Sequence, residues 1–320
     1  MMQSSGTDKS AGEGGNKTMR IRPVVLATAC VPWRADDSLD EDVFGREIAY
    51  LRAVGFDNLY IFGTAGEGYA VTDSQFKQIA GEFYALAGGG PGICQLGVIA
   101  MSVPQVRQRI EVGLEIGYRS FQVSLPPWGA LNDRELHTFF DEILGRYRHA
   151  TFLHYNVSRG LRRIRPQEYG KIASDHPNLV ATKIGGTTPA EDLALMRHAP
   201  QLCHFFTEFN FVHACLFGDC GLLASFSSIK PPFTLRLFEA GCRKNLAELT
   251  RLSGDLGRLY DIVLAVLRQG QHMDGAYDKM FLKAAIPEYP LRLLPPYQGS
   301  TDEEFENLLI QVRRQLPQWA

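Results

Sequence analysis

The chain has 320 residues, of which 45% are hydrophobic and 21% are charged. This composition is ordinary for a soluble globular protein, and it excludes collagen, a coiled coil and a wholly disordered chain. The 33 basic and 35 acidic side chains leave a formal net charge of -2, which gives no electrostatic case for nucleic acid or an anionic membrane as a partner. No apolar run is long enough for a membrane span or a signal peptide, so we expect a soluble, cytoplasmic protein.

The sequence starts with a polar segment and then alternates between short apolar runs and longer stretches of helical spacing. Residues 1–19 are almost wholly polar, which predicts a disordered tail. The short runs, rich in Val, Ile, Leu and Phe, predict strands at 23–30, 58–62, 93–99, 120–125, 151–155, 179–183, 204–207 and 221–225. Helical spacing predicts helices at 39–54, 73–86, 103–116, 133–147, 166–174, 189–197, 210–217, 233–240, 246–267, 277–285 and 302–316.

Eight strand–helix repeats of this length predict the α/β class and a (β/α)8 TIM barrel over residues 20–240. The remaining residues, 241–320, predict an additional C-terminal helical segment. A doubly wound open sheet also alternates strands and helices. It would usually carry a Gly-rich dinucleotide-binding or phosphate-binding turn after an early strand, and neither motif occurs here.

The six cysteines, at positions 30, 94, 203, 215, 220 and 242, form no C-x-x-C pair. They favour buried, reduced thiols over a zinc site or disulfides. The eight histidines are scattered, with no pair of ligand spacing at one strand end, so we predict no metal site.

Lys183 ends the predicted strand 179–183. The active site of a barrel lies at the C-terminal ends of its strands. Counting by two places Leu179, Ala181 and Lys183 on one face, which we expect to point into the barrel. A lysine held among apolar groups loses proton affinity and becomes a nucleophilic amine, as imine formation with a ketone requires. The alternative is a lysine that reaches out to solvent.

Tyr155 ends the strand 151–155 in the same way, and its phenol suits proton transfer beside an amine. The alternative is an aromatic side chain that only lines the mouth of the barrel. His154 faces the opposite way, where we expect it to pack against the helix layer.

The segment 63–68, Gly-Thr-Ala-Gly-Glu-Gly, follows the second strand directly. Small residues let consecutive backbone N–H groups converge on an anion, and Thr64 adds a hydroxyl. The segment lacks the lysine of a P-loop, which favours a carboxylate over a triphosphate. We interpret Glu67 as bracing the loop rather than as catalytic. An amine, a phenol and an anion-binding loop together predict a site for a 2-oxo acid.

At these positions the sequence resembles the dihydrodipicolinate synthase / N-acetylneuraminate lyase family of class I, Schiff-base-forming pyruvate aldolases. The family's G-T-T-G-E loop is similar to residues 63–67, its Y-N-V-P segment to residues 155–158, and its I-K strand end to residues 182–185. The order and spacing agree over about residues 21–300.

The resemblance implies a barrel that forms dimers or homotetramers, with Lys183 as the Schiff-base lysine and Tyr155 and Thr64 as a proton relay. It implies that the backbone of Thr64 and Ala65 holds the substrate carboxylate and that the backbone of Leu223 meets the bound ketoacid. It also implies no metal and no other cofactor, because the lysine imine carries the chemistry.

Three residues depart from the family pattern. Ala65 replaces the second threonine of the loop, so one hydroxyl is lost. Trp128 stands where the synthase has a tyrosine that is supplied across a dimer interface, and an indole cannot shuttle protons at ordinary pH. We expect Trp128 to contact substrate, and the alternative is that it fills a subunit interface. Arg159 matches the synthase's arginine for its second substrate only with a one-residue deletion, and the alternative is an exposed loop arginine.

We therefore expect a Schiff-base lyase or synthase that acts on pyruvate and a longer 2-oxo acid, and not the lysine-pathway enzyme. A sugar-acid (2-keto-3-deoxy acid) dehydratase would use the same lysine imine. A homologue that senses a ketoacid without catalysis is an alternative of another class. The sequence leaves the second substrate and the direction of the reaction open.

Overall fold

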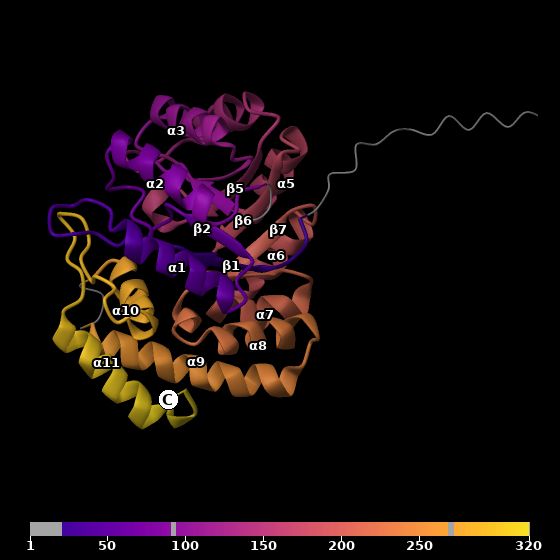
Figure 1. Cartoon of the computed structure of the whole chain (residues 1–320). Helices are drawn as coiled ribbons and strands as arrows, with labels where there is room; N and C mark the ends of the chain where they lie inside the picture. Colours follow the sequence, from indigo (N-terminus) through magenta and orange to yellow (C-terminus); the bar gives the residue numbers. More distant parts are fainter. Residues whose placement is uncertain (1–20, 91–93, 268–271, 320) are drawn as a thin grey trace, which may run out of the picture.

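The structure is a computed structural model that describes residues 21–90, 94–267 and 272–319. In these residues eight parallel strands close into one barrel, with β1 paired to β8 (Figure 1). The strands are β1 (Val25–Thr28), β2 (Asn58–Ile61), β3 (Cys94–Gly97), β4 (Ser120–Val123), β5 (Thr151–Asn156), β6 (Leu179–Ile184), β7 (Cys203–Thr207) and β8 (Gly221–Ala224). The predicted barrel is confirmed, and closure excludes the open sheet. The predicted tail, 1–19, lies outside the described residues.

Helices alternate with the strands and cover the outside of the barrel. They are α1 (Glu41–Ala53), α2 (Asp73–Leu86), α3 (Val103–Ile116), α4 (Asp133–Phe140), α5 (Pro166–Asp175), α6 (Pro189–His198), α7 (Glu208–Phe217) and α8 (Pro231–Cys242). The expected helix over 133–147 differs, because it continues beyond α4 as a π-helical turn, Asp141–Gly145. Apolar spacing does not separate the two forms, since this turn also buries Ile143 and Leu144.

Local sequence fixes where several of these helices begin. Thr72, Asn132 and Thr188 each accept a hydrogen bond from the backbone N–H three residues on. The Gln or Glu at that third position bonds back to the backbone of the cap, which completes a capping box. These caps satisfy N–H groups that have no partner inside the helix.

Side chains that point inward form a separate apolar cluster inside the barrel: Leu26, Tyr60, Leu153, Val180, Ala181, Cys203, Phe205 and Leu223. One part of the predicted inward face is wrong. The pairing of β5 with β6 shifts register, so that Phe152 opposes Leu179 while Leu153 opposes Ala181. This bulge places Leu179 in the outer, helix-facing core and Val180 in the interior cluster. The strand regains its alternation after it, so Ala181 and Lys183 keep the predicted direction.

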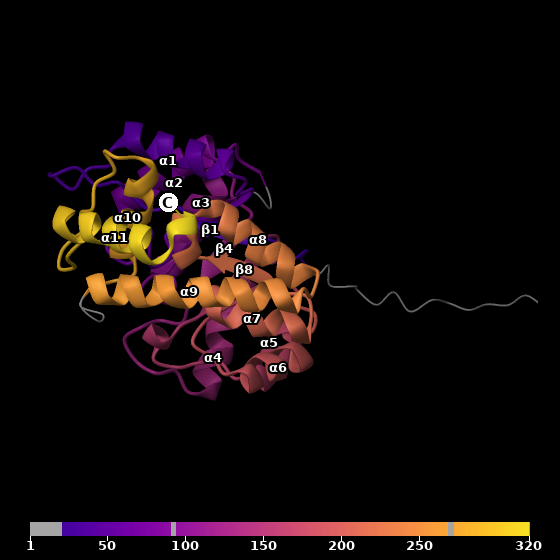
Figure 2. The same cartoon turned by 90° about the horizontal axis from the view of Figure 1, so that it is seen from below.

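Three further helices follow the barrel in the described chain: α9 (Leu246–Val266), α10 (Gly275–Ala285) and α11 (Asp302–Gln315). The long helix α9 packs on α7 and α8, and α11 packs on α9, as the view from below shows (Figure 2). By contrast, α10 packs against the turn Phe226–Ile229 that follows β8, which brings it to the C-terminal ends of the strands. The division of the chain at residue 240 stays a prediction. No described helix combines the length and apolarity needed to cross a bilayer.

All six cysteines are free, and five of them are buried as expected. The expectation is wrong for Cys242, which is exposed. Cys242 is the last residue of α8, where the packed face of the helix ends.

A buried ion pair ties α10 to the loop after β2. The Glu67 carboxylate accepts hydrogen bonds from Lys279 Nζ at 2.7 Å, from Trp33 Nε1 at 2.8 Å and from the backbone N–H of Leu294 at 2.7 Å. Glu67 and Lys279 are both fully buried. The interpretation of Glu67 as a brace is confirmed, because its oxygens point into this network.

We predict that Lys279→Met strongly destabilises the fold, because it leaves the Glu67 carboxylate buried without its counter-charge. Removing one partner of a buried pair costs about 3–5 kcal/mol. The measurement is the free energy of unfolding from denaturant titration, with thermal melting as a second readout.

The matched control is Lys283→Met on the same helix. Lys283 pairs with Asp302 at 3.5 Å, and the Asp302 side chain is 81% exposed. A surface pair of this kind contributes about 0–1 kcal/mol. Equal losses of unfolding free energy in the two variants would show that the Glu67–Lys279 pair stabilises the fold no more than the Lys283–Asp302 pair does.

Candidate active site

Lys183 crosses the interior of the barrel. It is 2% exposed, so the alternative of a solvent-reaching lysine is wrong. Its Nζ donates a hydrogen bond of 2.8 Å to the hydroxyl of Tyr60, which lies on β2, the strand opposite β6 in the ring. The same Nζ lies 3.9 Å from the ring centre of Tyr155 and 4.3 Å from that of Tyr60. The amine therefore sits between two aromatic faces at the C-terminal end of the barrel.

Burial lowers the pKa of Lys183 to about 7, although Asp274 and Asp278 act in the opposite direction. Burial has the larger effect because an ammonium ion inside the barrel loses its hydration. At neutral pH a large fraction of the amine is therefore unprotonated, the form that attacks a carbonyl carbon.

Tyr155 pairs directly with Lys183 across β5 and β6. Burial raises the pKa of Tyr155, and a hydrogen bond with Thr64 lowers it in part. The phenol therefore stays protonated at neutral pH, ready to donate. His154, on the opposite face of β5, contacts Tyr169 at 2.7 Å in the outer layer, which confirms its predicted packing role.

The segment 63–68 packs tightly on the end of β2. A Cβ on Gly66 would lie 2.7 Å from the Phe62 nitrogen, and one on Gly68 would lie 2.5 Å from the Phe62 oxygen. These two glycines are therefore required by close backbone approach. The resulting tight turn turns Thr64 and Ala65 toward the cavity that contains Lys183.

This inner cavity has a volume of about 160 Å³. It brings together five of the predicted site residues: Lys183, Tyr155, Thr64, Ala65 and, from β8, Leu223. The sequence prediction missed other residues of its wall. They are Thr28, Tyr60, Thr207, Glu208, Phe209, Ala224, Ser225, Asp274, Tyr277 and Asp278.

Asp274, Tyr277 and Asp278 enter from the start of α10. Their spacing of three and four residues places them on one side of the helix. Two acidic residues spaced four apart on a helix with a buried face are a sequence signal that could have identified them as site residues. Nothing in the local sequence, however, indicates that this helix faces Lys183.

An outer cavity of about 680 Å³ shares Thr64 and Tyr155 with the inner one. Its wall is mainly apolar: Ala70, Ile99, Met101, Leu125, Pro127, Val157, Met273, Pro295 and Pro296, with Tyr69 and Tyr297. Arg159 also lines it, and its guanidinium lies 3.4 Å from both Thr64 Oγ1 and Asp274 Oδ1. The Arg159 side chain is 47% exposed, as the alternative of an exposed loop arginine expects, and it also contacts Thr64, which lines both cavities.

Trp128 lies outside both cavities and is 85% exposed. Its neighbour Pro127 forms part of the outer cavity's wall. Within one chain, therefore, the structure does not bring Trp128 to Lys183.

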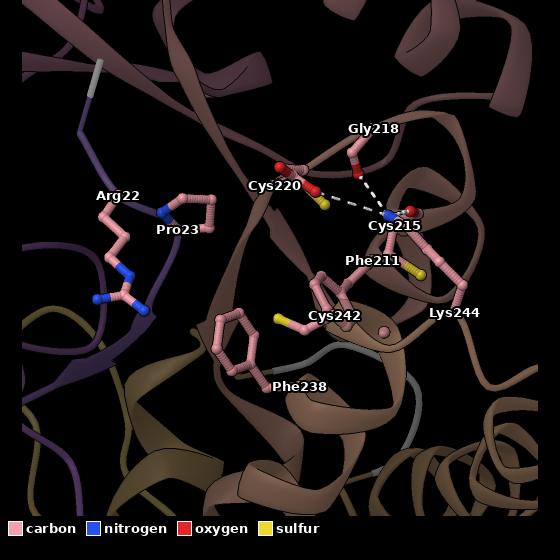
Figure 3. Close-up of a pocket in the computed structure, with 11 residues that line it drawn as sticks. Arg22, Pro23, Phe211, Cys215, Gly218, Cys220, Phe238, Cys242 and Lys244 are labelled. Atoms are coloured by element: carbon pink, nitrogen blue, oxygen red, sulfur yellow. Dashed lines mark hydrogen bonds and ion pairs between the residues drawn. The ribbon is translucent and has the colours of Figure 1, made fainter. Parts of the chain in front are cut away.

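Another cavity, of about 280 Å³, lies at the opposite end of the barrel. Its wall includes Arg22 and Pro23 before β1 and three cysteines, Cys215, Cys220 and Cys242 (Figure 3). Lys244 donates to the carbonyl of Gly218 at 3.0 Å beside it. Residues at the N-terminal face of a barrel support its stability, so we do not place chemistry there. In the described part of the chain, no three His, Cys, Asp or Glu side chains gather as a metal site.

No protein-family profile matches the chain. Curated proteins do match it along most of its length. It is 20% identical over 291 residues to an uncharacterized DapA-like lyase of Pyrococcus abyssi, which covers 89% of this chain and 95% of that protein. It is 24% identical over 291 residues to the N-acetylneuraminate lyase of Mus musculus, which covers 89% of both.

Solved structures share the fold. YagE, a prophage protein of E. coli K12 in the dihydrodipicolinic acid synthase family, solved in complex with pyruvate, superposes with a TM-score of 0.80 at 15% identity, covering 91% of this chain and 98% of that one. The N-acetylneuraminate lyase of Proteus mirabilis superposes with a TM-score of 0.79 at 17% identity, covering 92% and 98%. Along most of its length the chain therefore resembles lyases of the dihydrodipicolinate synthase / N-acetylneuraminate lyase family, and it shares the fold of the family's solved members.

Proposed function

We propose that the protein is a Schiff-base lyase that makes or breaks a carbon–carbon bond between pyruvate and a longer partner half of a 2-oxo acid. The observation that carries this proposal is Lys183, a buried amine with a pKa lowered to about 7 that lines a small cavity at the C-terminal end of the barrel. The amine attacks the ketone and water leaves, which produces an iminium ion. This ion accepts the electron pair of the neighbouring carbon–carbon bond, so the proposed reaction needs no metal and no further cofactor.

The small inner cavity suits the pyruvate half. In the proposed complex the substrate carboxylate lies at the loop of Thr64 and Ala65, and the ketone carbon lies at Lys183. Leu223 closes the remaining side. A loop held rigidly by Glu67 supports this placement, because a carboxylate anchor that does not move fixes the ketone relative to the amine.

Tyr155 moves the proton of the carbon–carbon step. Its ring lies beside Lys183 Nζ, and its hydroxyl bonds with Thr64 at the boundary between the cavities. In condensation the phenol donates its proton to the aldehyde oxygen of the partner half as the carbon–carbon bond forms, and cleavage is the reverse of this step. Thr64 completes this relay.

The outer cavity supports a partner half that is longer and more apolar than aspartate semialdehyde. Its wall is mainly aliphatic and aromatic, with Arg159 as a charged side chain, so a long apolar partner half would contact more of this wall than a short, charged aldehyde would. We infer that the enzyme is distinct from the lysine-pathway synthase. We also propose that the protein forms a homo-oligomer in which the exposed Trp128 of one copy reaches the outer cavity of another.

Our first prediction for this reaction is that borohydride in the presence of pyruvate adds one reduced pyruvate to Lys183. Peptide mapping by mass spectrometry locates the adduct. Lys183→Ala should abolish it, whereas Lys171→Ala, a change at a lysine whose side chain is 63% exposed, should not. An adduct on any other lysine would contradict the assignment.

The reactivity of Lys183 should follow a pKa of about 7, which burial produces. Because only the unprotonated amine reacts, labelling by a small acylating reagent should rise about tenfold per pH unit below this value and level off above it. Exposed lysines in the same digest should keep gaining reactivity up to about pH 10. If the reactivity of Lys183 instead keeps rising with pH as that of the exposed lysines does, the pKa of Lys183 is not lowered.

The choice of substrate tests the proposals about the outer cavity and Trp128. We expect poor condensation of pyruvate with aspartate semialdehyde, alongside measurable pyruvate release from a longer 2-oxo acid in a panel. Trp128→Tyr should change the ranking of the panel, because a phenol both shortens the ring system and adds a proton donor. Efficient condensation with aspartate semialdehyde would overturn the inference from the outer cavity. An unchanged ranking would leave Trp128 as a subunit-interface residue only.

A further inference from the structure

Asp278 is a buried acid in the wall of the Lys183 cavity. It lies on α10, it is 4% exposed, and it forms part of the cavity wall. The next residue, Lys279, is fixed by its buried pair with Glu67. Successive residues of a helix point in directions about 100° apart, so the anchoring of Lys279 also fixes the direction of Asp278.

One oxygen of this carboxyl group is unused. Asp278 Oδ1 is buried and has no hydrogen-bond partner in the described part of the chain. Buried polar atoms without a partner are rare in folded proteins, and they call for an explanation such as a ligand or a catalytic role. Here the unpartnered oxygen belongs to a residue that shares a small cavity with the amine of Lys183.

The surroundings favour the protonated form of Asp278. Burial raises its pKa well above the usual value for an aspartate, and the nearby Asp274 and Glu208 raise it further, while Lys183 acts the other way. A neutral carboxylic acid beside an amine is a proton donor. Burial raises the pKa of Tyr60 and of Tyr277 well above the usual value for a tyrosine, so these two phenols hold their protons more firmly than an ordinary phenol does.

We propose that Asp278 is a further catalytic residue, which protonates the hydroxyl of the carbinolamine so that it leaves as water. This inference rests on the proposed function, because it concerns the formation of the Lys183 imine.

The step balances in atoms and charge. Neutral Lys183 adds to the ketone carbon, and the amine proton moves to the former ketone oxygen, which gives a neutral carbinolamine. Asp278 donates its proton to that hydroxyl, the C–O bond breaks, and the nitrogen lone pair forms the C=N bond of the iminium ion. The products are water, a cationic iminium and the Asp278 carboxylate. The cavity therefore exchanges two neutral groups for an ion pair, and no net charge is buried.

The division of labour with Tyr155 follows from position. Tyr155 lies on the wall between the cavities, where the partner half of the substrate joins the pyruvate half. Asp278 lines the inner cavity but not the outer one. We therefore assign the water-forming step to Asp278 and the carbon–carbon step to Tyr155.

The experiment measures imine formation separately from cleavage. Purified enzyme is mixed with pyruvate and quenched with borohydride at successive times, and intact-protein mass spectrometry gives the fraction trapped. Asp278→Asn keeps the shape but has no acidic proton, so trapping should slow by roughly 10²–10⁴-fold. Asp278→Glu, which keeps the acid, should retain more of the rate. Tyr155→Phe should form the imine but release pyruvate slowly from the longer 2-oxo acid.

The matched control is Asp255→Asn, the same change at a 3% exposed aspartate of α9 that lines neither cavity. It should lower the melting temperature without slowing the trapping. If Asp278→Asn fails to fold, Asp278→Val tests the same step, because it has a similar shape and leaves no polar atom buried.

Wild-type trapping rates in Asp278→Asn or Asp278→Val would overturn the inference while leaving the lyase proposal intact. An equal slowing in Asp255→Asn would overturn it too, because the effect would then be one of stability. No adduct in the wild type would overturn both the lyase proposal and this inference.

Discussion

The buried pair between Glu67 and Lys279 is the constraint on which the rest of the site depends. It joins a loop at the end of β2 to a helix more than two hundred residues later in the chain, and the Glu67 carboxylate also holds Trp33 and Leu294. The pair therefore fixes two walls of the inner cavity at once. One wall carries Thr64 and the other carries Asp278.

A charge balance inside this cavity explains why a lysine can be buried there. Lys183 has one aromatic ring on each side and one hydroxyl as acceptor, and its nearest acids lie on α10. Full ionisation of both the amine and the acids would place several charges in a small closed volume. Burial instead shifts the pKa of Lys183 downward and that of Asp278 upward, so both tend toward the neutral form.

The sequence predicts what depends on local periodicity and misses what depends on closure of the ring. Lys183 and Tyr155 are strand ends, so their direction follows from counting along one strand. The error at Leu179 comes from a bulge, which shifts the alternation by one residue and is not marked by any characteristic amino acid. Tyr60 approaches Lys183 only because β2 and β6 are opposite each other once the barrel closes. Asp278 arrives from a helix outside the repeats, whose docking no local pattern specifies.

The two cavities define the orientation that a substrate spanning them would take. Thr64 and Tyr155 belong to both walls, so a 2-oxo acid that spans the cavities must pass beside these two hydrogen-bonded residues. In the proposed reaction the bond that breaks lies at this passage, since the imine carbon is held at Lys183 and the partner half extends outward. The inner cavity then sets the common chemistry through groups fixed by burial and ion pairing. In the same proposal the outer cavity, whose wall is mainly apolar and includes Pro127 beside Trp128, selects the partner half, so substrate range can change there without disturbing the amine.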